Sequence, residues 1–271
     1  MKPLLKFLLI GSGSVAVLVV ATVIGIAVWL SVPGGIAASE HHPFRSPAAK
    51  QRYLKLYATM EGRWPVVSET TLLGTSYGQT FVRISGPDGA PPLVLLHGAG
   101  GSSLHWTPNI EALSEQYRTY AVDIIGDFGR SVYTRPIESA ADYVTWLDEL
   151  FDALGLGDDI NLMGLSYGAW LTSQYALRFP DRLDKTVWLA PGGTVLPLSS
   201  EIRRASLSVL PHRYFTKRVM YWLMEDLAQR DDASRMILDE WVDAAFLGIA
   251  SYRPRRMVPP PVLTDDELQS I

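Results

Sequence analysis

A single serine stands between two glycines where a predicted strand meets a predicted helix. An apolar run begins at Ile160 and leads into Gly164-Leu165-Ser166-Tyr167-Gly168. Residues 169–179 then have apolar side chains at helical spacing, and this stretch ends before Pro180. A strand that turns directly into a helix brings backbone atoms very close on both sides of the turn, and glycine fits there best. The spacing therefore predicts a sharp turn that lifts the Ser166 hydroxyl clear of a sheet.

Several short apolar runs on either side of this turn predict further strands. The region 70–86 is predicted to hold two strands around residues 76–79, residues 118–122 are predicted as another, and the runs at 92–96 and 186–190 are predicted as buried strands. Between the runs lie stretches with helical spacing, one of which begins at Ser139 with Asp142 as its capping partner. Strands that alternate with helices predict an α/β fold with a doubly wound, mostly parallel sheet.

Composition narrows the class of protein. Apolar residues make up 48% and charged residues 19% of the chain, as in a globular protein with a membrane segment. The net charge is −4 and the basic residues are scattered, so no nucleic-acid partner is expected. The chain has no cysteine, which excludes disulfides, thiolate metal sites and a cysteine nucleophile. Nothing in the sequence calls for a metal or an organic cofactor.

The N-terminal segment is long and apolar. Residues 7–32 carry no charge and would extend about 39 Å as a helix, enough to cross a bilayer. We expect an uncleaved, single-pass transmembrane anchor, with a cleaved signal as the alternative because Ala37-Ala38-Ser39 follows. Basic residues stand on both sides of the span, so the side of the membrane is left open.

Changes in composition suggest the domain boundaries. We expect an anchor over residues 1–33, a linker and juxtamembrane helix over 34–69, an α/β core over 70–196, a helical cap over 197–258 and the start of a C-terminal core segment over 259–271. The cap is predicted as helices at 200–209, 214–228 and 232–249, which carry many large apolar side chains. Such a cap would exclude water and shape an apolar pocket over the serine.

The turn at Ser166 and the glycine-rich loop after residue 96 suit acyl-transfer chemistry. Such chemistry needs a nucleophile and hydrogen-bond donors for an oxyanion. Ser166 is the candidate nucleophile, and the backbone N–H of Tyr167 is one candidate donor because it begins a helix. The second donor is expected from the loop after the strand at 92–96, with Ala99 as first choice and Gly100 as second.

Other residues are candidates for the walls of a substrate pocket. We expect Gly98 from the glycine-rich loop, His105 near that loop and Trp222 from the cap to line it. His97 ends the strand before that loop and is expected to support the loop rather than act as a base.

Three motifs together carry a resemblance. In chain order they are His97-Gly98-x-Gly100-Gly101, Asp123-x-x-Gly126-x-x-Gly129-Arg130-Ser131 and Gly164-Leu165-Ser166-Tyr167-Gly168. This set resembles the α/β-hydrolase superfamily, in particular its capped, serine-esterase-like branch, from about Thr70 to the end of the chain. Asp127 stands where relatives often have His, and Ile125 where they often have Pro. Both differences fall in a loop expected to be structural.

The resemblance also implies residues that the sequence does not supply. In that superfamily an acid and a histidine follow the cap and complete a triad, whereas the last histidine here is His212, inside the cap. We therefore expect a truncated form of a longer hydrolase, impaired in activity.

Two functions are expected from these observations. The first is a membrane-anchored serine hydrolase that cleaves a small-molecule carboxylic ester, or a related acyl compound, through an acyl-enzyme on Ser166. The alternative is a catalytically inactive, hydrolase-like protein that binds an apolar ligand or a partner under the cap. Loss of a serine-reactive label in a Ser166 variant would distinguish them.

Overall fold

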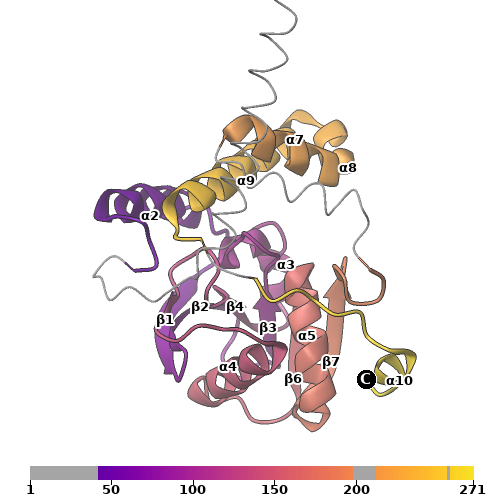
Figure 1. Cartoon of the computed structure of the whole chain (residues 1–271). Helices are drawn as coiled ribbons and strands as arrows, with labels where there is room; N and C mark the ends of the chain where they lie inside the picture. Colours follow the sequence, from indigo (N-terminus) through magenta and orange to yellow (C-terminus); the bar gives the residue numbers. More distant parts are fainter. Residues whose placement is uncertain (1–41, 198–211, 255–256) are drawn as a thin grey trace, which may run out of the picture. The chain divides into compact units, whose positions relative to one another are not determined.

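A mixed β-sheet organises the chain in the computed structural model, which describes residues 42–197, 212–254 and 257–271 (Figure 1). In these ranges the strands are β1 (Ser68–Thr75), β2 (Gly78–Ser85), β3 (Pro92–Leu96), β4 (Arg118–Val122), β5 (Val132–Tyr133), β6 (Ile160–Leu165) and β7 (Leu183–Leu189). Their order in the sheet is β1-β2-β4-β3-β6-β7, with the short β5 paired to β2. The strands predicted around residue 77 and at 92–96, 118–122, 160–165 and 186–190 are confirmed as strands. The prediction that the strand at 186–190 is buried is wrong, because β7 lies at the end of the strand order and exposes Val187 and Leu189.

The direction of the strands divides the sheet into two parts. The four strands β4, β3, β6 and β7 run parallel, whereas β1 and β2 are antiparallel to each other and β2 is antiparallel to β4. The predicted mostly parallel sheet is therefore confirmed, with an antiparallel pair at one side. The carboxyl ends of the parallel strands meet at one edge, where ligands bind in open α/β sheets.

Helices and short turns connect the strands. They are α2 (Pro47–Glu61), η1 (Ser103–Trp106), α3 (Ile110–Ser114), α4 (Ala140–Ala153), α5 (Tyr167–Arg178), η2 (Pro180–Arg182), α7 (Arg213–Leu223), α8 (Glu225–Arg230), α9 (Asp232–Ser251) and α10 (Asp265–Gln269). The predicted capping of α4 is confirmed, because the Ser139 hydroxyl accepts the Asp142 N–H and the Asp142 carboxylate accepts the Ser139 N–H.

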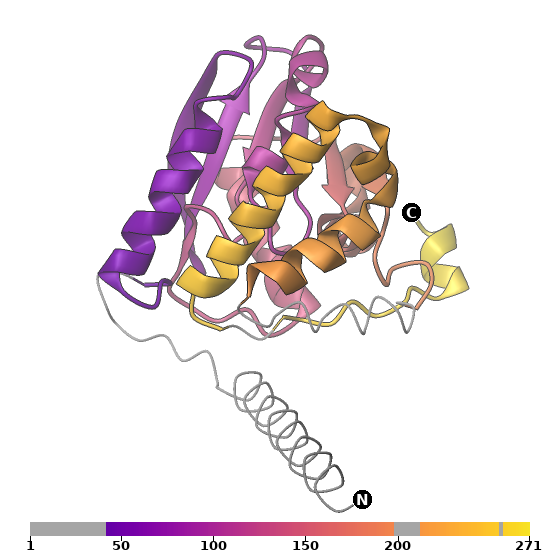
Figure 2. The same cartoon turned by 90° about the horizontal axis from the view of Figure 1, so that it is seen from above.

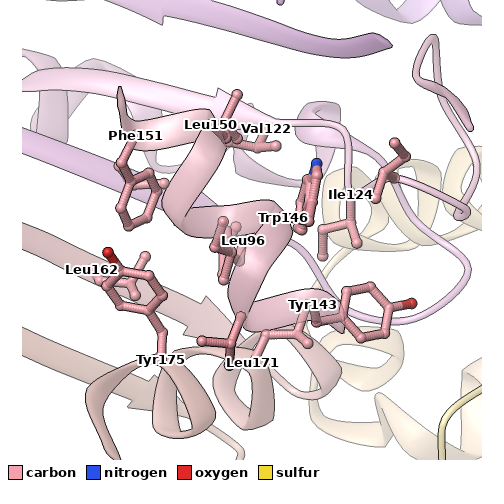
Figure 3. Packing of buried hydrophobic residues seen from close by; sticks show 14 of the residues in the cluster. Leu96, Val122, Ile124, Tyr143, Trp146, Leu150, Phe151, Leu162, Leu171 and Tyr175 are labelled. Carbon is pink, nitrogen blue, oxygen red and sulfur yellow. The ribbon is translucent and has the colours of Figure 1, made fainter. Parts of the chain in front are cut away.

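Both faces of β3, in the middle of the parallel strands, are covered by apolar side chains. Along β3, Val94 and Leu96 pack against α4 and α5 in one cluster, while Leu93 and Leu95 pack against η1 and α3 in another. Figure 3 shows the first cluster, in which aromatic rings from α4 and α5 fill the space above the sheet. Successive side chains of a strand point to opposite faces, so a strand buried on both sides reads as a continuous apolar run.

Helices α2 and α9 lie side by side, and α7 and α8 pack against α9 (Figure 1, Figure 2). These elements and the sheet belong to one unit of the chain, Gly35–Arg253 with Met257–Ile271. The predicted helix at 214–228 is interrupted at Met224, which separates α7 from α8, and the predicted helix at 232–249 is α9. The predicted helix at 200–209 lies outside the described residues.

A short clasp joins the segment before α2 to the end of α9. Phe44 and Tyr252 form an antiparallel bridge, in which the Arg45 N–H donates to Ser251 O at 2.8 Å and the Arg253 N–H donates to Pro43 O at 3.0 Å. The rings of Phe44, Tyr53, Tyr57, Phe81 and Tyr252 form a cluster behind this clasp.

Within residues 42–197, 212–254 and 257–271, no helix is both long and apolar enough to span a bilayer. The predicted anchor, residues 7–32, lies outside these ranges.

Candidate active site

Ser166 stands at the junction of β6 and α5 in a conformation that few non-glycine residues adopt. Its φ is 53° and its ψ is −109°. Conformations of this kind cost about 1–3 kcal/mol and occur mainly where function requires them. The predicted succession of strand, turn and helix is confirmed, and the Ser166 side chain is partly exposed at the carboxyl end of β6.

The glycines on either side let the turn close. A Cβ on Gly164 would overlap the backbone of Gly168, and a Cβ on Gly168 would overlap the carbonyl oxygen of Leu96 at the end of β3. The predicted steric reason for both glycines is therefore confirmed.

Two hydrogen bonds hold the turn against its surroundings. The Ser166 N–H donates to Leu189 O of β7 at 2.8 Å, which continues the strand pairing up to the serine. The Tyr167 hydroxyl donates to Val258 O at 2.9 Å and ties the start of α5 to the segment that follows the cap. The first bond fixes the backbone of Ser166, the second fixes the side chain of Tyr167, and neither uses the Ser166 hydroxyl.

The glycine-rich loop after β3 packs against this serine. A Cβ on Gly98 would lie 3.4 Å from the Cβ of Ser166, so the two backbones approach at this point. Of the residues predicted to line the site, Gly98 is the one that the structure brings directly to Ser166.

His97 orients the first peptide of the loop. Its imidazole is fully buried, and Nε2 accepts the Ile124 N–H at 3.0 Å. Nδ1 must then carry the proton, which it donates to Gly98 O at 2.8 Å. Both ring nitrogens are used, so His97 is not available as a base for Ser166. The prediction that it supports the loop agrees with this geometry.

The two candidate donors of the loop differ in their partners. Gly98 O also accepts the Gly101 N–H at 3.2 Å, and in a trans peptide the Ala99 N–H points the opposite way. Among the hydrogen bonds between described residues, none uses the Ala99 N–H. The Gly100 N–H, in contrast, donates to the Asp127 carboxylate at 3.1 and 3.2 Å. The geometry thus favours Ala99 over Gly100 as the donor.

His105 lies between the loop and the cap. A Cβ on Gly101 would overlap its ring, and the ring centroid is 5.4 Å from that of Trp241 in α9. Burial, with a smaller contribution from His97, lowers the pKa of His105 to about 4. The side chain is therefore neutral at pH 7, in contact with the loop that carries the candidate donors.

Trp222, the cap residue predicted to line the pocket, is exposed on the surface. It lies near the end of α7 with 47% of its surface exposed. Trp241 of α9 packs on His105, which in turn packs on Gly101 of the glycine-rich loop. Trp241 was not among the pocket residues predicted from the sequence.

Asp123 holds together three segments around the loop. Its fully buried carboxylate accepts the N–H groups of Ser103 and Arg130, both at 2.7 Å, and the Tyr57 hydroxyl at 3.1 Å. Burial, followed by the charge of Asp123, raises the pKa of Tyr57 well above its usual value, so this hydroxyl remains a donor. Helix α2 is thereby connected to the glycine-rich loop.

In the part of the chain that the structure describes, no group of three or more His, Cys, Asp or Glu side chains could hold a metal ion.

Known proteins with similar sequences and folds are consistent with this geometry. Residues 93–270 match the model of the "Alpha/beta hydrolase family". The "Uncharacterized carboxylesterase nap" of Bacillus subtilis is 36% identical over 222 residues, which cover 81% of this chain and 72% of that protein. The "Carboxylesterase YbfK" of the same organism is 34% identical over 226 residues, covering 81% and 73%.

A solved structure of a carboxylesterase has a similar fold. The crystal structure of naproxen esterase (carboxylesterase NP) from Bacillus subtilis superposes with a TM-score of 0.72 and 33% sequence identity, over 83% of this chain and 78% of that one.

Proposed function

This chain belongs to the α/β-hydrolase family, and on that premise we propose that it hydrolyses small-molecule carboxylic esters through a covalent acyl intermediate on Ser166. The observation that carries the proposal is the strained turn at Ser166 packed against a glycine-rich loop. Two relatives that resemble most of the chain are named carboxylesterases, which supports esters as the substrate class.

Each residue of the site has a role in this reaction. The Ser166 hydroxyl loses its proton to a base and attacks the ester carbonyl, which becomes a tetrahedral oxyanion. The N–H groups of Ala99 and Tyr167 donate to that oxyanion as its charge develops. The alkoxide leaves with a proton, and a water molecule then attacks the acyl-enzyme and releases the carboxylic acid. In the family the base that takes the serine proton and returns it to the leaving alkoxide is a histidine that follows the cap in the sequence, whereas the last histidine of this sequence is His212.

The cap favours substrates with apolar groups. Helix α9 presents Trp241 toward His105, next to the glycine-rich loop, and α7 packs on α9. Aromatic side chains above a serine nucleophile exclude water and accommodate an apolar acyl or alcohol group.

We also propose that residues 7–32 anchor the enzyme in a membrane as a single-pass helix, since this run is uncharged and long enough to cross a bilayer. The full chain should sediment with membranes and resist extraction with alkaline carbonate. Release of the intact chain by carbonate would overturn the proposal of an anchor.

Covalent labelling of the serine tests the proposed reaction. The full chain is incubated with a fluorophosphonate probe and with p-nitrophenyl butyrate, together with the variants Ser166→Ala and Ser76→Ala. Ser76 lies between β1 and β2, where its hydroxyl contacts Glu149, and serves as the matched control. We expect label, and hydrolysis slower than that of a hydrolase with a complete triad, in the wild type and in Ser76→Ala, and neither in Ser166→Ala. Absence of label in the wild type would contradict the acyl-enzyme and favour an inactive, ligand-binding protein.

A further inference from the structure

A buried carboxylate lies beside the glycine-rich loop, and the reaction described above does not use it. Asp127 is in the loop between β4 and β5, and 2% of its surface is exposed. Its Oδ1 accepts the Phe128 N–H at 2.8 Å and the Gly100 N–H at 3.2 Å, while Oδ2 lies 3.1 Å from the Gly100 nitrogen. The carboxylate thus joins its own loop to the loop that contains Ala99.

The position of Gly100 determines how the Ala99 peptide is held. The peptide before Ala99 is fixed by its carbonyl, because Gly98 O accepts from His97 Nδ1 and from the Gly101 N–H. The peptide after Ala99 is fixed by its N–H, which is the Gly100 N–H bound to Asp127. Gly100 has a φ of 74°, a left-handed conformation that glycine adopts readily. Asp127 therefore restrains one side of Ala99 and His97 the other.

The neighbouring Phe128 links the same carboxylate to the cap. A Cβ on Gly100 would be 3.8 Å from the Phe128 ring, and a Cβ on Gly248 of α9 would overlap that ring. The Asp127 loop itself is held by the Asp127 N–H, which donates to Ile124 O at 2.9 Å. The carboxylate acts from a fixed loop that lies between the cap helix and the loop of Ala99.

We propose that Asp127 is a positioning residue for ester hydrolysis. By accepting the Gly100 N–H, it holds the Ala99 N–H in the direction required to donate to the oxyanion. This role rests on the function proposed for Ser166, but the restraint on the loop exists whether or not the enzyme turns over. It can therefore be measured in two independent ways.

Two substitutions of Asp127 distinguish its role as a hydrogen-bond acceptor from the effect of its negative charge. Asp127→Ala removes the acceptor for the Gly100 N–H. Asp127→Asn keeps one carboxamide oxygen, which can accept both the Gly100 and the Phe128 N–H, as Oδ1 does in the wild type. Thr80→Val serves as a control for a loss of stability. It removes the buried hydrogen bond that the indole N–H of Trp146 in α4 donates to the Thr80 hydroxyl in β2 at 2.8 Å.

The first measurement is steady-state hydrolysis of p-nitrophenyl butyrate by the full chain. We expect Asp127→Ala to lower kcat by about 10- to 100-fold with little change in KM, because the donor acts on the transition state rather than on the bound ester. Asp127→Asn should restore kcat to within about threefold of the wild type, and Thr80→Val should lower Tm without changing kcat. A kcat for Asp127→Ala within twofold of the wild type, or equal losses in the Ala and Asn variants, would overturn the proposal.

The second measurement is amide hydrogen exchange in the segment 98–101, which requires no catalysis. We expect exchange there to be about tenfold faster or more in Asp127→Ala, and unchanged in Asp127→Asn and Thr80→Val. Unchanged exchange in Asp127→Ala would also overturn the proposal. If the wild type neither labels nor hydrolyses the ester, the function proposed for Ser166 fails, and the exchange result still decides whether Asp127 positions the loop.

Discussion

His105 shows how the surroundings of one side chain link stability to pH. Its imidazole lies between Gly101 and Trp241, and burial lowers its pKa from 6.5 to about 4. The unfolded chain therefore binds a proton on this residue over a range of pH in which the folded protein does not. Stability from His105 is fully present above pH 6.5 and is lost as the pH falls toward 4.

We expect His105→Gln to be less sensitive to acid than the wild type. Between pH 7 and pH 4 the wild type should lose about 2–3 kcal/mol of unfolding free energy through this residue, a loss that the variant avoids. Urea unfolding at several pH values measures the difference. His212→Gln is the control, because His212 is exposed before α7. Parallel pH dependence of all three proteins would contradict the role of His105.

At the scale of single residues, the sequence predicted some roles and missed others. Glycines spaced around Ser166 require a close backbone approach, which is a local property and can be read directly. The roles of Asp127 and Trp241 depend on contacts with segments distant in the chain, at Gly100 and His105. From the sequence, Asp127 is only a residue that differs from the His common in relatives, in a loop expected to be structural. In the structure its carboxylate accepts the Gly100 N–H and so contacts the loop of the candidate donors.

The junction of β6 and α5 is the element on which the position of Ser166 depends. Helix α5 can begin directly after the strand because Gly168 has no side chain to meet the carbonyl of Leu96 in β3. A methyl group there has no free space, and either the helix or the strand must move.

We expect Gly168→Ala to destabilise the protein by about 1–3 kcal/mol and to reduce labelling of Ser166, because the helix start must shift. Thermal unfolding and the rate of fluorophosphonate labelling measure these two effects. Gly157→Ala is a matched control, since a Cβ on Gly157 would meet nothing within 4 Å. Equal behaviour of the two variants would show that the close approach at Gly168 is not limiting.

Elements with a strong local signal were predicted well. Apolar runs identified β3 and β7, and the residues at positions 139 and 142 identified the start of α4. The sequence from Trp106 to Glu115 suits one helix, but in the structure η1 ends at Trp106 and α3 covers Ile110–Ser114. Pro108 lies between them and has no N–H to continue a helix. The break at Met224 has no comparable signal in the sequence.

In the described part of the molecule, one small residue sets how closely helix α9 approaches the loop between β4 and β5. Gly248 lets α9 approach the ring of Phe128, which in turn packs on Tyr252 with ring centroids 4.9 Å apart. A side chain at position 248 would separate the helix from the loop that carries Asp127.

We expect Gly248→Val to destabilise the protein by about 1–3 kcal/mol and to raise KM, because α9 moves away from the loops around Ser166. Ala250→Val, two residues further along α9 at a partly exposed position, carries the same cost of a β-branched residue in a helix and is the control. Denaturant unfolding and steady-state kinetics compare the two variants. A similar KM in both would contradict a role for the close approach of α9.

The clasp between residues 43–45 and 251–253 has a mechanical consequence. Its hydrogen bonds, from Arg45 to Ser251 and from Arg253 to Pro43, join the start of α2 to the last turn of α9. A pulling force applied to the chain ahead of Pro43 is therefore borne by the clasp and by the end of α9 before it reaches the sheet. If residues 7–32 anchor the chain as proposed, tension on that anchor would act on the cap through this clasp before it reached the strand that precedes Ser166.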